Sequence, residues 1–136
     1  MNQGTLLLKN MSFKVGQTLT LVGTAKADAT NFAVNIGPDE KDVTMHINPR
    51  FDAHGDQNVV VCNSYQGGVW CAEQRETSFP FTVGGEFKIS ITFNPAEFLV
   101  VLPDGSSFTF PNRMGLEKYS VVNVDGDARI TTIEIK

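Results

Sequence analysis

Hydrophobic side chains recur at every second position along much of this chain, and this period constrains its fold more than any other feature. Side chains two residues apart share one face of a β-strand, so each run predicts a strand with one buried face. The runs are Leu19 and Leu21; Phe32, Val34 and Ile36; Phe87, Ile89, Ile91 and Phe93; and Ile133 and Ile135. The nearest approach to a helical stripe, at residues 114–119, allows one turn at most. We therefore expect an all-β protein with little or no helix.

Turn signals separate the predicted strands. They are Val15-Gly16, Gly37-Pro38-Asp39, Gly67-Gly68, Gly84-Gly85, Asn94-Pro95, Pro103-Asp104-Gly105 and Asp125-Gly126-Asp127. Turns at this spacing are typical of hairpins and Greek keys in a β-sandwich or a closed barrel. A lipid-binding barrel of similar length inserts a helical pair after its first strand, where this chain has only the turn at Gly16, so the sandwich is favoured. The whole chain, residues 1–136, fits a single domain.

Composition excludes several classes of partner. Eleven basic and fifteen acidic side chains give a net charge of -4 without a basic cluster, so we expect no nucleic-acid or anionic membrane partner. The N-terminal ten residues lack the features of a secretory signal, and no stretch approaches the roughly 20 apolar residues of a membrane span. We expect a soluble, cytosolically made protein without membrane insertion. Cys62 and Cys71 lack zinc-ribbon spacing, so we expect free thiols, no metal and no cofactor.

A row of polar residues breaks the hydrophobic pattern at residues 46–51, which read HINPRF. His46, Asn48 and Arg50 would lie on one strand face, in a row about 13 Å long at about 3.3 Å per residue. A solvated outer face is the simpler interpretation, but these three side chains suit directed hydrogen bonds better than an ordinary solvent face does. Pro49 donates no ladder hydrogen bond, which predicts a sheet edge or a bend there.

A second polar cluster follows a Gly-Gly turn at residues 67–68. Asn63 closes the preceding apolar strand, and Trp70, Glu73 and Arg75 follow the turn. Glu73 and Arg75 would share a face if this segment is extended. Trp70 is the only tryptophan and is either a core residue beside the turn or an exposed stacking platform.

Seven motifs together resemble the galectins. They are H-x-N-P-R-F at 46–51, H-G-D at 54–56, V-V-C-N-S at 60–64, W-x-x-E-x-R at 70–75, F-P-F at 79–81, L-P-D-G at 102–105 and F-P-N-R at 110–113. The resemblance runs essentially end to end and is similar to the single-domain, dimer-forming (prototype) branch. It implies a jelly-roll-like β-sandwich of two antiparallel sheets, whose concave sheet holds β-galactosides such as lactose and N-acetyllactosamine.

The resemblance also implies which residues contact the sugar. They are His46, Asn48, Arg50, Asn63, Trp70, Glu73 and Arg75, with His54 as a secondary contact. Two positions depart from the usual pattern: Ile47 stands where Phe is usual, and Cys71 where Gly commonly follows the tryptophan. We expect Ile47 to point away from the row. Cys71 is either a buried, inert thiol or a group whose modification weakens binding.

These positions suit galactose. The C–H face left by its axial 4-hydroxyl can lie on Trp70, while His46, Asn48 and Arg50 meet that hydroxyl. We further expect Glu73 to lie between Arg50 and Arg75 and to hold both guanidinium groups rigid.

In the prototype branch, two terminal strands pair across a two-fold axis. Here they are residues 5–8 and 130–135, with Leu6, Leu8, Ile133 and Ile135 as candidate interface residues. The alternative is that these side chains only complete each monomer's core. The resemblance implies a homodimer that cross-links glycans on glycoproteins or glycolipids, made in the cytoplasm and secreted without a signal peptide.

Other functions have weaker support. A glycosidase needs two carboxyl groups about 5–10 Å apart, and the cluster offers only Glu73, which arginines occupy. A thiol hydrolase at Cys62 or a zinc site has no supporting spacing. We expect no catalytic residues. A protein-interaction module on the same fold, with secondary sugar binding, remains the alternative.

Overall fold

The computed structural model describes residues 5–136, and within this range the chain is all β. The strands are β1 (Leu6–Leu8), β2 (Phe13–Lys14), β3 (Thr18–Ala25), β4 (Phe32–Gly37), β5 (Val43–Ala53), β6 (Asp56–Gln66), β7 (Val69–Trp70), β8 (Gln74–Glu76), β9 (Glu86–Phe93), β10 (Glu97–Val101), β11 (Ser107–Pro111), β12 (Lys118–Tyr119), β13 (Val121–Gly126) and β14 (Ala128–Ile135). Residues 1–4 lie outside this range. They belong to the predicted domain and to the N-terminal ten residues that lack a secretory signal. Among the described residues, no helix is long and apolar enough to cross a membrane.

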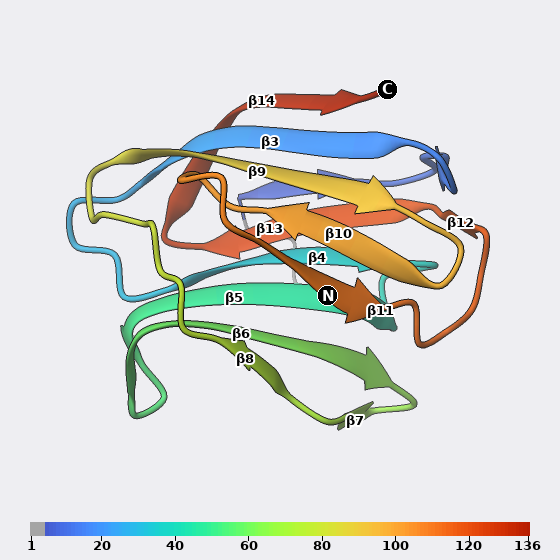
Figure 1. Ribbon diagram of the computed structural model, residues 1–136, viewed down its shortest axis with the longest axis horizontal. Helices are drawn as coiled ribbons and strands as arrows, with labels where there is room; N and C mark the ends of the chain where they lie inside the picture. Colours follow the sequence, from blue (N-terminus) through green and yellow to red (C-terminus); the bar gives the residue numbers. More distant parts are fainter. Residues whose placement is uncertain (1–4) are drawn as a thin grey trace.

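The strands form two main antiparallel sheets (Figure 1). Among residues 5–136, the larger sheet has the order β1-β13-β4-β5-β6-β7, with β8 also paired to β6. The other has the order β11-β10-β9-β3-β14, and β12 pairs with β2. Neighbours distant in sequence, such as β13 and β4, give the sheets their jelly-roll-like connectivity. The predicted fold class, a sandwich of two antiparallel sheets, is confirmed.

The core lies between the sheets and takes its side chains from the predicted runs. Leu19 and Leu21 of β3 and Ile89 and Ile91 of β9 are fully buried. Alternate positions along β3 and β9 are more exposed, as expected of strands with one buried face. Aromatic pairs join the sheets: the rings of Phe32 and Phe87 stack with centroids 4.7 Å apart. This packing fixes the larger sheet that carries the polar row.

Of the two alternatives predicted at Pro49, a sheet edge or a bend, the edge is wrong, because β5 lies inside its sheet between β4 and β6. Its ladder with β4 covers Met45 to Ile47 and resumes as a single bridge between Arg50 and Asn31. Pro49 falls between these two stretches. A residue without an N–H is therefore accommodated on an interior strand where regular pairing with β4 is interrupted.

The terminal strands lie at sheet edges, one in each main sheet. β1 pairs with β13 at the edge of the larger sheet, and β14 pairs with β3 at the edge of the smaller one. Leu6, Ile133 and Ile135 are half-buried and pack against the monomer's own core, and Leu8 is half-buried. Among the described strands, neither edge has a further neighbour, so backbone groups there could pair with an added strand.

Candidate functional site

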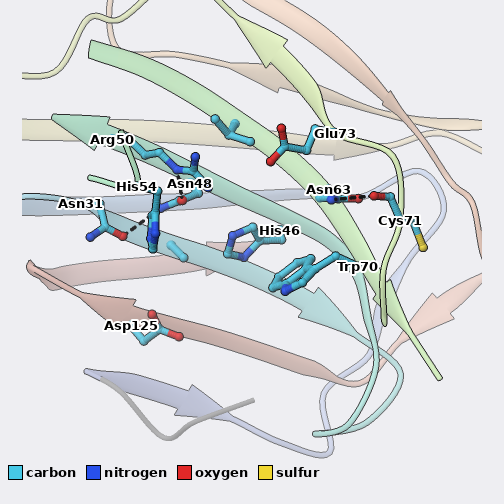
Figure 2. A pocket seen from close by; sticks show the side chains of 12 residues that line it. Asn31, His46, Asn48, Arg50, His54, Asn63, Trp70, Cys71, Glu73 and Asp125 are labelled. Atoms are coloured by element: carbon cyan, nitrogen blue, oxygen red, sulfur yellow. Dashed lines mark hydrogen bonds between the residues drawn. The ribbon is translucent and has the colours of Figure 1, made fainter. Parts of the chain in front are cut away.

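The polar row on β5 forms the floor of an open groove of about 620 Å³, within the usual range for ligand sites (Figure 2). The lining residues are Asn31, Ala33, His46, Asn48, Arg50, His54, Val61, Asn63, Trp70, Cys71, Glu73 and Asp125. All the predicted sugar contacts except Arg75 are among them. Ile47, between two members of the row, is fully buried on the opposite face, as expected. Strand alternation thus separates the groove from the core.

Two tight turns bring His54 and Trp70 to the groove. His54 and Gly55 connect β5 to β6 with φ values of 53° and 80°, the left-handed pair required by a type I′ hairpin. Gly67 and Gly68 connect β6 to β7 with φ values of 60° and 83°. A β-carbon is strained at positive φ, so the second turn uses glycine to bring Trp70 beside β6, opposite Tyr65.

Trp70 is an exposed aromatic residue, so it is not a core residue. Its side chain is 53% exposed. Its ring lies 4.7 Å from that of His46 at 55°, and 5.0 Å from that of Tyr65 at 65°. Neighbouring rings therefore fix the indole while leaving much of it free for a ligand (Figure 2).

His46 is neutral at neutral pH and is held by a buried amide. Its Nδ1 lies 2.6 Å from Oδ1 of Asn35. Burial, followed by the charge of Arg50, lowers its pKa to about 4. Figure 2 shows its ring beside that of Trp70, both facing the groove.

Asn48 is locked by its neighbours so that it presents an acceptor. Its Nδ2 donates both protons, to Oδ1 of Asn31 at 3.1 Å and to the carbonyl of Phe32 at 2.7 Å. Its Oδ1 accepts from Nε of Arg50 at 2.8 Å and keeps a second lone pair. Arg50 retains N–H donors after this bond, so acceptor and donor lie side by side in the groove.

Asp56, and not Glu73, joins the two arginines. Its Oδ2 lies 2.6 Å from Nη1 of Arg50, and its Oδ1 lies 2.9 Å from Nη1 of Arg75. The predicted position of Glu73 between both arginines is therefore wrong; Glu73 accepts from Nη2 of Arg75 at 3.0 Å through Oε1. The hydrogen bonds from Arg75 and then from Arg50 lower the pKa of Asp56, which keeps it ionised. Arg75 lies outside the groove lining and acts on the groove through its partners.

Hydrogen bonds from Asn63 and Arg113 hold the segment that follows Trp70. Asn63 donates through Nδ2 to the carbonyl of Cys71 at 3.0 Å, and Arg113 donates through Nη2 to the carbonyl of Ala72 at 2.7 Å. Arg113 also donates to Oγ of Ser64 at 2.9 Å. These bonds position Glu73 without a continuous strand, which explains how it reaches the groove.

Cys71 and Cys62 are both free thiols, as predicted, but they differ in environment. Cys71 is exposed and lines the groove, so the buried alternative for it is wrong. Cys62 is fully buried, and this burial raises its pKa. Cys71 is therefore the accessible thiol of the pair.

Sequence reasoning missed Asn31, Asp56, Arg113 and Asp125. Asp125 lies on β13, which long-range pairing places beside β4, and burial raises its pKa. The His54-Gly55 hairpin signal could have revealed Asp56, because a two-residue turn pairs residue 53 with residue 56 and brings Asp56 near Arg50. Nothing in the local sequence indicates Asp125.

The groove combines an aromatic platform with hydrogen-bonding groups that remain available. In the described chain these include the second lone pair of Asn48 Oδ1, the Oε2 of Glu73, the remaining donors of Arg50 and one N–H of Asn63. Directed polar groups beside an exposed indole suit a ligand with several hydroxyls and one apolar face. Among residues 5–136, no group of three or more His, Cys, Asp or Glu could hold a metal ion.

Comparison with known proteins identifies the family. The family model described as galactoside-binding lectin matches residues 4–135. The chain is a galectin. The resemblance of its motifs to this family is confirmed, and because galectins are lectins, this galectin is not an enzyme.

Individual relatives agree over nearly the whole length. A β-galactoside-binding lectin of Electrophorus electricus is 56% identical over 94% of this galectin and 95% of that protein. The structure of lactose- and MES-liganded congerin II is 36% identical, covers 96% of this chain and 98% of its own, and has a TM-score of 0.91. CG-16, a homodimeric agglutinin from chicken liver, is 40% identical over 96% of this chain and 98% of its own, with a TM-score of 0.92.

Proposed function

We propose that this galectin binds β-galactosides of the lactose and N-acetyllactosamine type in the groove and cross-links them as a homodimer. The observation that carries the proposal is the half-exposed indole of Trp70 beside the row of His46, Asn48 and Arg50. Support also comes from the family and from congerin II, whose structure is described as lactose-liganded.

Trp70 supplies the apolar contact. In β-galactose the axial 4-hydroxyl leaves a patch of C–H groups on one ring face, which can lie flat on the indole and displace water from both surfaces. Glucose, whose 4-hydroxyl is equatorial, would meet the same indole with its polar groups misplaced. The rings of His46 and Tyr65 hold the indole in place, so little ordering remains for the ligand to impose.

His46, Asn48 and Arg50 recognise the axial hydroxyl. One hydroxyl can donate to an acceptor of the row and accept from Arg50, so a single oxygen uses both kinds of group. A sugar without that oxygen would leave these groups unpaired, at about 1–3 kcal/mol. This difference is the basis of selectivity for galactose.

Asn63 and Glu73 extend recognition along the disaccharide. The remaining N–H of Asn63 and Oε2 of Glu73 are available to bond the 6-hydroxyl of galactose. Arg50 and Glu73 can reach the 3-hydroxyl of the following glucose or N-acetylglucosamine. Asp56 orients the Arg50 guanidinium before binding, so less entropy is lost when the sugar arrives. The exposed imidazole of His54, on the hairpin turn, is a secondary contact.

Dimerisation would turn one weak site into a cross-linker. An open groove holds a single disaccharide weakly, whereas two linked sites bind clustered glycans with greater avidity. The edges of β1 and β14 are available for pairing across a two-fold axis, with Leu6, Leu8, Ile133 and Ile135 nearby. The chicken relative, described as homodimeric, supports dimerisation.

The physiological partners would be glycoproteins or glycolipids that carry terminal galactosides. We place the protein in the cytoplasm and, after secretion without a signal peptide, outside the cell, because that is where such glycans are displayed.

Retention on immobilised lactose tests the function. We expect the protein to bind the column and to be released by free lactose but not by sucrose at the same concentration. Passage straight through the column would overturn the proposal in favour of a protein-interaction module on the same fold. Hydrolysis of lactose during incubation would contradict a purely binding role.

A further inference from the structure

A row of amides connects the groove to the edge strand β1. Cross-strand pairing sets Asn123 of β13 opposite Asn35 of β4, and Asn35 opposite His46 of β5. The side chains are joined in sequence: Asn123 Nδ2 lies 3.1 Å from the carbonyl of Leu6, Asn35 Nδ2 lies 3.1 Å from Asn123 Oδ1, and His46 Nδ1 lies 2.6 Å from Asn35 Oδ1. Both amides are buried, with 4% exposure for Asn35 and 0% for Asn123.

The carbonyl of Leu6, at one end of the amide row, determines which atoms donate and which accept along the whole row. The carbonyl of Leu6 can only accept, so the Asn123 atom that faces it must be the amide nitrogen. The other terminal atom of Asn123 is then the oxygen, which requires Asn35 to present its nitrogen. By the same step, Asn35 presents its oxygen to His46. An amide oxygen can only accept, so His46 must donate through Nδ1.

We propose that Asn123 and Asn35 are positioning residues that transmit the polarity of the Leu6 carbonyl to His46 and select its Nδ1–H tautomer. Nε2 of His46 is then unprotonated and faces the groove as an acceptor. Neutral imidazole has one protonated nitrogen, so the opposite tautomer would place a donor there. The β1 strand, although distant from the groove in sequence, thus determines which hydroxyl geometry the groove accepts.

The consequence for sugar recognition rests on the proposed function. An acceptor at Nε2 complements the donors of Arg50 around one hydroxyl, because the hydroxyl donates to the first and accepts from the second. With the other tautomer, both groups would be donors, and the hydroxyl proton would lose its partner on His46. The low pKa of His46, about 4, keeps the ring neutral, so a tautomer choice exists at neutral pH.

Imidazole ¹⁵N NMR tests the proposal, because it distinguishes protonated from unprotonated ring nitrogens. In the full-length, sugar-free protein at neutral pH, we expect His46 to be protonated at Nδ1. In Asn123→Leu, which removes both the donor to Leu6 and the acceptor for Asn35, the amide of Asn35 is free to turn over. We expect a substantial Nε2–H population and a loss of lactose affinity of about tenfold, the effect of one mispaired hydrogen bond.

Thr5→Val is the matched control. The Thr5 hydroxyl donates to the carbonyl of Val124 at 3.1 Å, so it also links the β1 segment to β13, but outside the row. We expect this variant to lose stability without a change of tautomer. An Nε2–H signal for His46 in the unmodified protein overturns the proposal, even if Asn123→Leu fails to fold. An unchanged tautomer in a folded Asn123→Leu overturns it too.

The tautomer and the sugar affinity are measured separately. If the protein binds lactose with His46 protonated at Nε2, only the proposed role of Asn123 and Asn35 is disproved. A protein with the Nδ1–H tautomer that fails to bind lactose disproves the proposed function and leaves the structural assignment standing.

Discussion

The imidazole of His46 and the indole of Trp70 lie with their ring centroids 4.7 Å apart and their planes inclined at 55°. This contact joins the polar row on β5 to the aromatic platform on β7, although strand β6 lies between the two strands in the sheet. It places an apolar surface and directed hydrogen bonds within the span of one hexose ring.

Trp70→Ala should remove lactose binding while leaving the fold nearly unchanged. The half-exposed indole contributes contact area to the ligand rather than to the core. We expect an affinity loss of about 30-fold or more, equivalent to about 2 kcal/mol. The free energy of unfolding should change by less than about 1 kcal/mol.

Calorimetric titration with lactose and urea unfolding measure these two effects. Val69→Ala is the control, because Val69 is 63% exposed on the same short strand and lies outside the groove lining. It should retain lactose affinity. A large loss of stability in Trp70→Ala would show that the indole is structural.

Asp56→Asn should weaken binding through Arg50. The amide cannot form ion pairs with both Arg50 and Arg75, so the Arg50 guanidinium becomes less ordered before the sugar arrives. We expect lactose affinity to fall about tenfold. The control is Asp52→Asn, an exposed carboxylate on the same hairpin. Equal affinities of the two variants would contradict this role.

Stability should fall as the pH decreases from about 6.5 towards 4, partly because of His46. Its folded pKa is about 4 and its unfolded value is 6.5, so in this window the unfolded chain binds a proton that the folded chain rejects. One such proton contributes a slope of at most about 1.4 kcal/mol per pH unit. Urea unfolding at several pH values should show a shallower slope for His46→Gln. Parallel curves would mean that His46 is not buried in its neutral form.

Alkylation should modify Cys71 in the native protein and weaken binding. Cys71 is exposed beside Trp70, whereas burial of Cys62 raises its pKa and blocks access to its thiol. A group added at Cys71 would intrude into the groove, and we expect a several-fold loss of lactose affinity after treatment with iodoacetamide. Cys71→Ser, treated identically, should keep its affinity. Equal affinity of the native protein before and after modification would exclude this effect.

The sequence predicts those parts of the site that depend on local periodicity. Alternation along β5 places His46, Asn48 and Arg50 on one face, because strand geometry alone determines it. The Gly-Gly turn likewise indicates that Trp70 follows a hairpin. The exposure of the indole is not a local property, since it depends on what the other sheet and the loops leave uncovered.

The remainder depends on contacts between distant segments. Asp125 reaches the groove only because β13 pairs with β4, and the amide row needs Asn123 and Asn35 to lie opposite each other. The two-residue spacing of Glu73 and Arg75 predicts a shared strand face, but the segment before β8 is not a strand, and the ion pair of Arg50 is with Asp56. Register between strands, rather than residue type, decides these partners.

Ile135→Lys should separate cross-linking from sugar binding. Ile135 is half-buried near the end of the edge strand β14, where a lysine would oppose strand addition from a second copy. We expect a monomer in analytical ultracentrifugation that keeps its lactose affinity but no longer agglutinates galactoside-coated particles, because avidity requires two linked sites. Ser107→Lys adds the same charge at an exposed position of β11, the opposite edge strand of that sheet, and should remain dimeric and agglutinating. A dimeric Ile135→Lys would favour the alternative in which this side chain only completes the core of its own monomer.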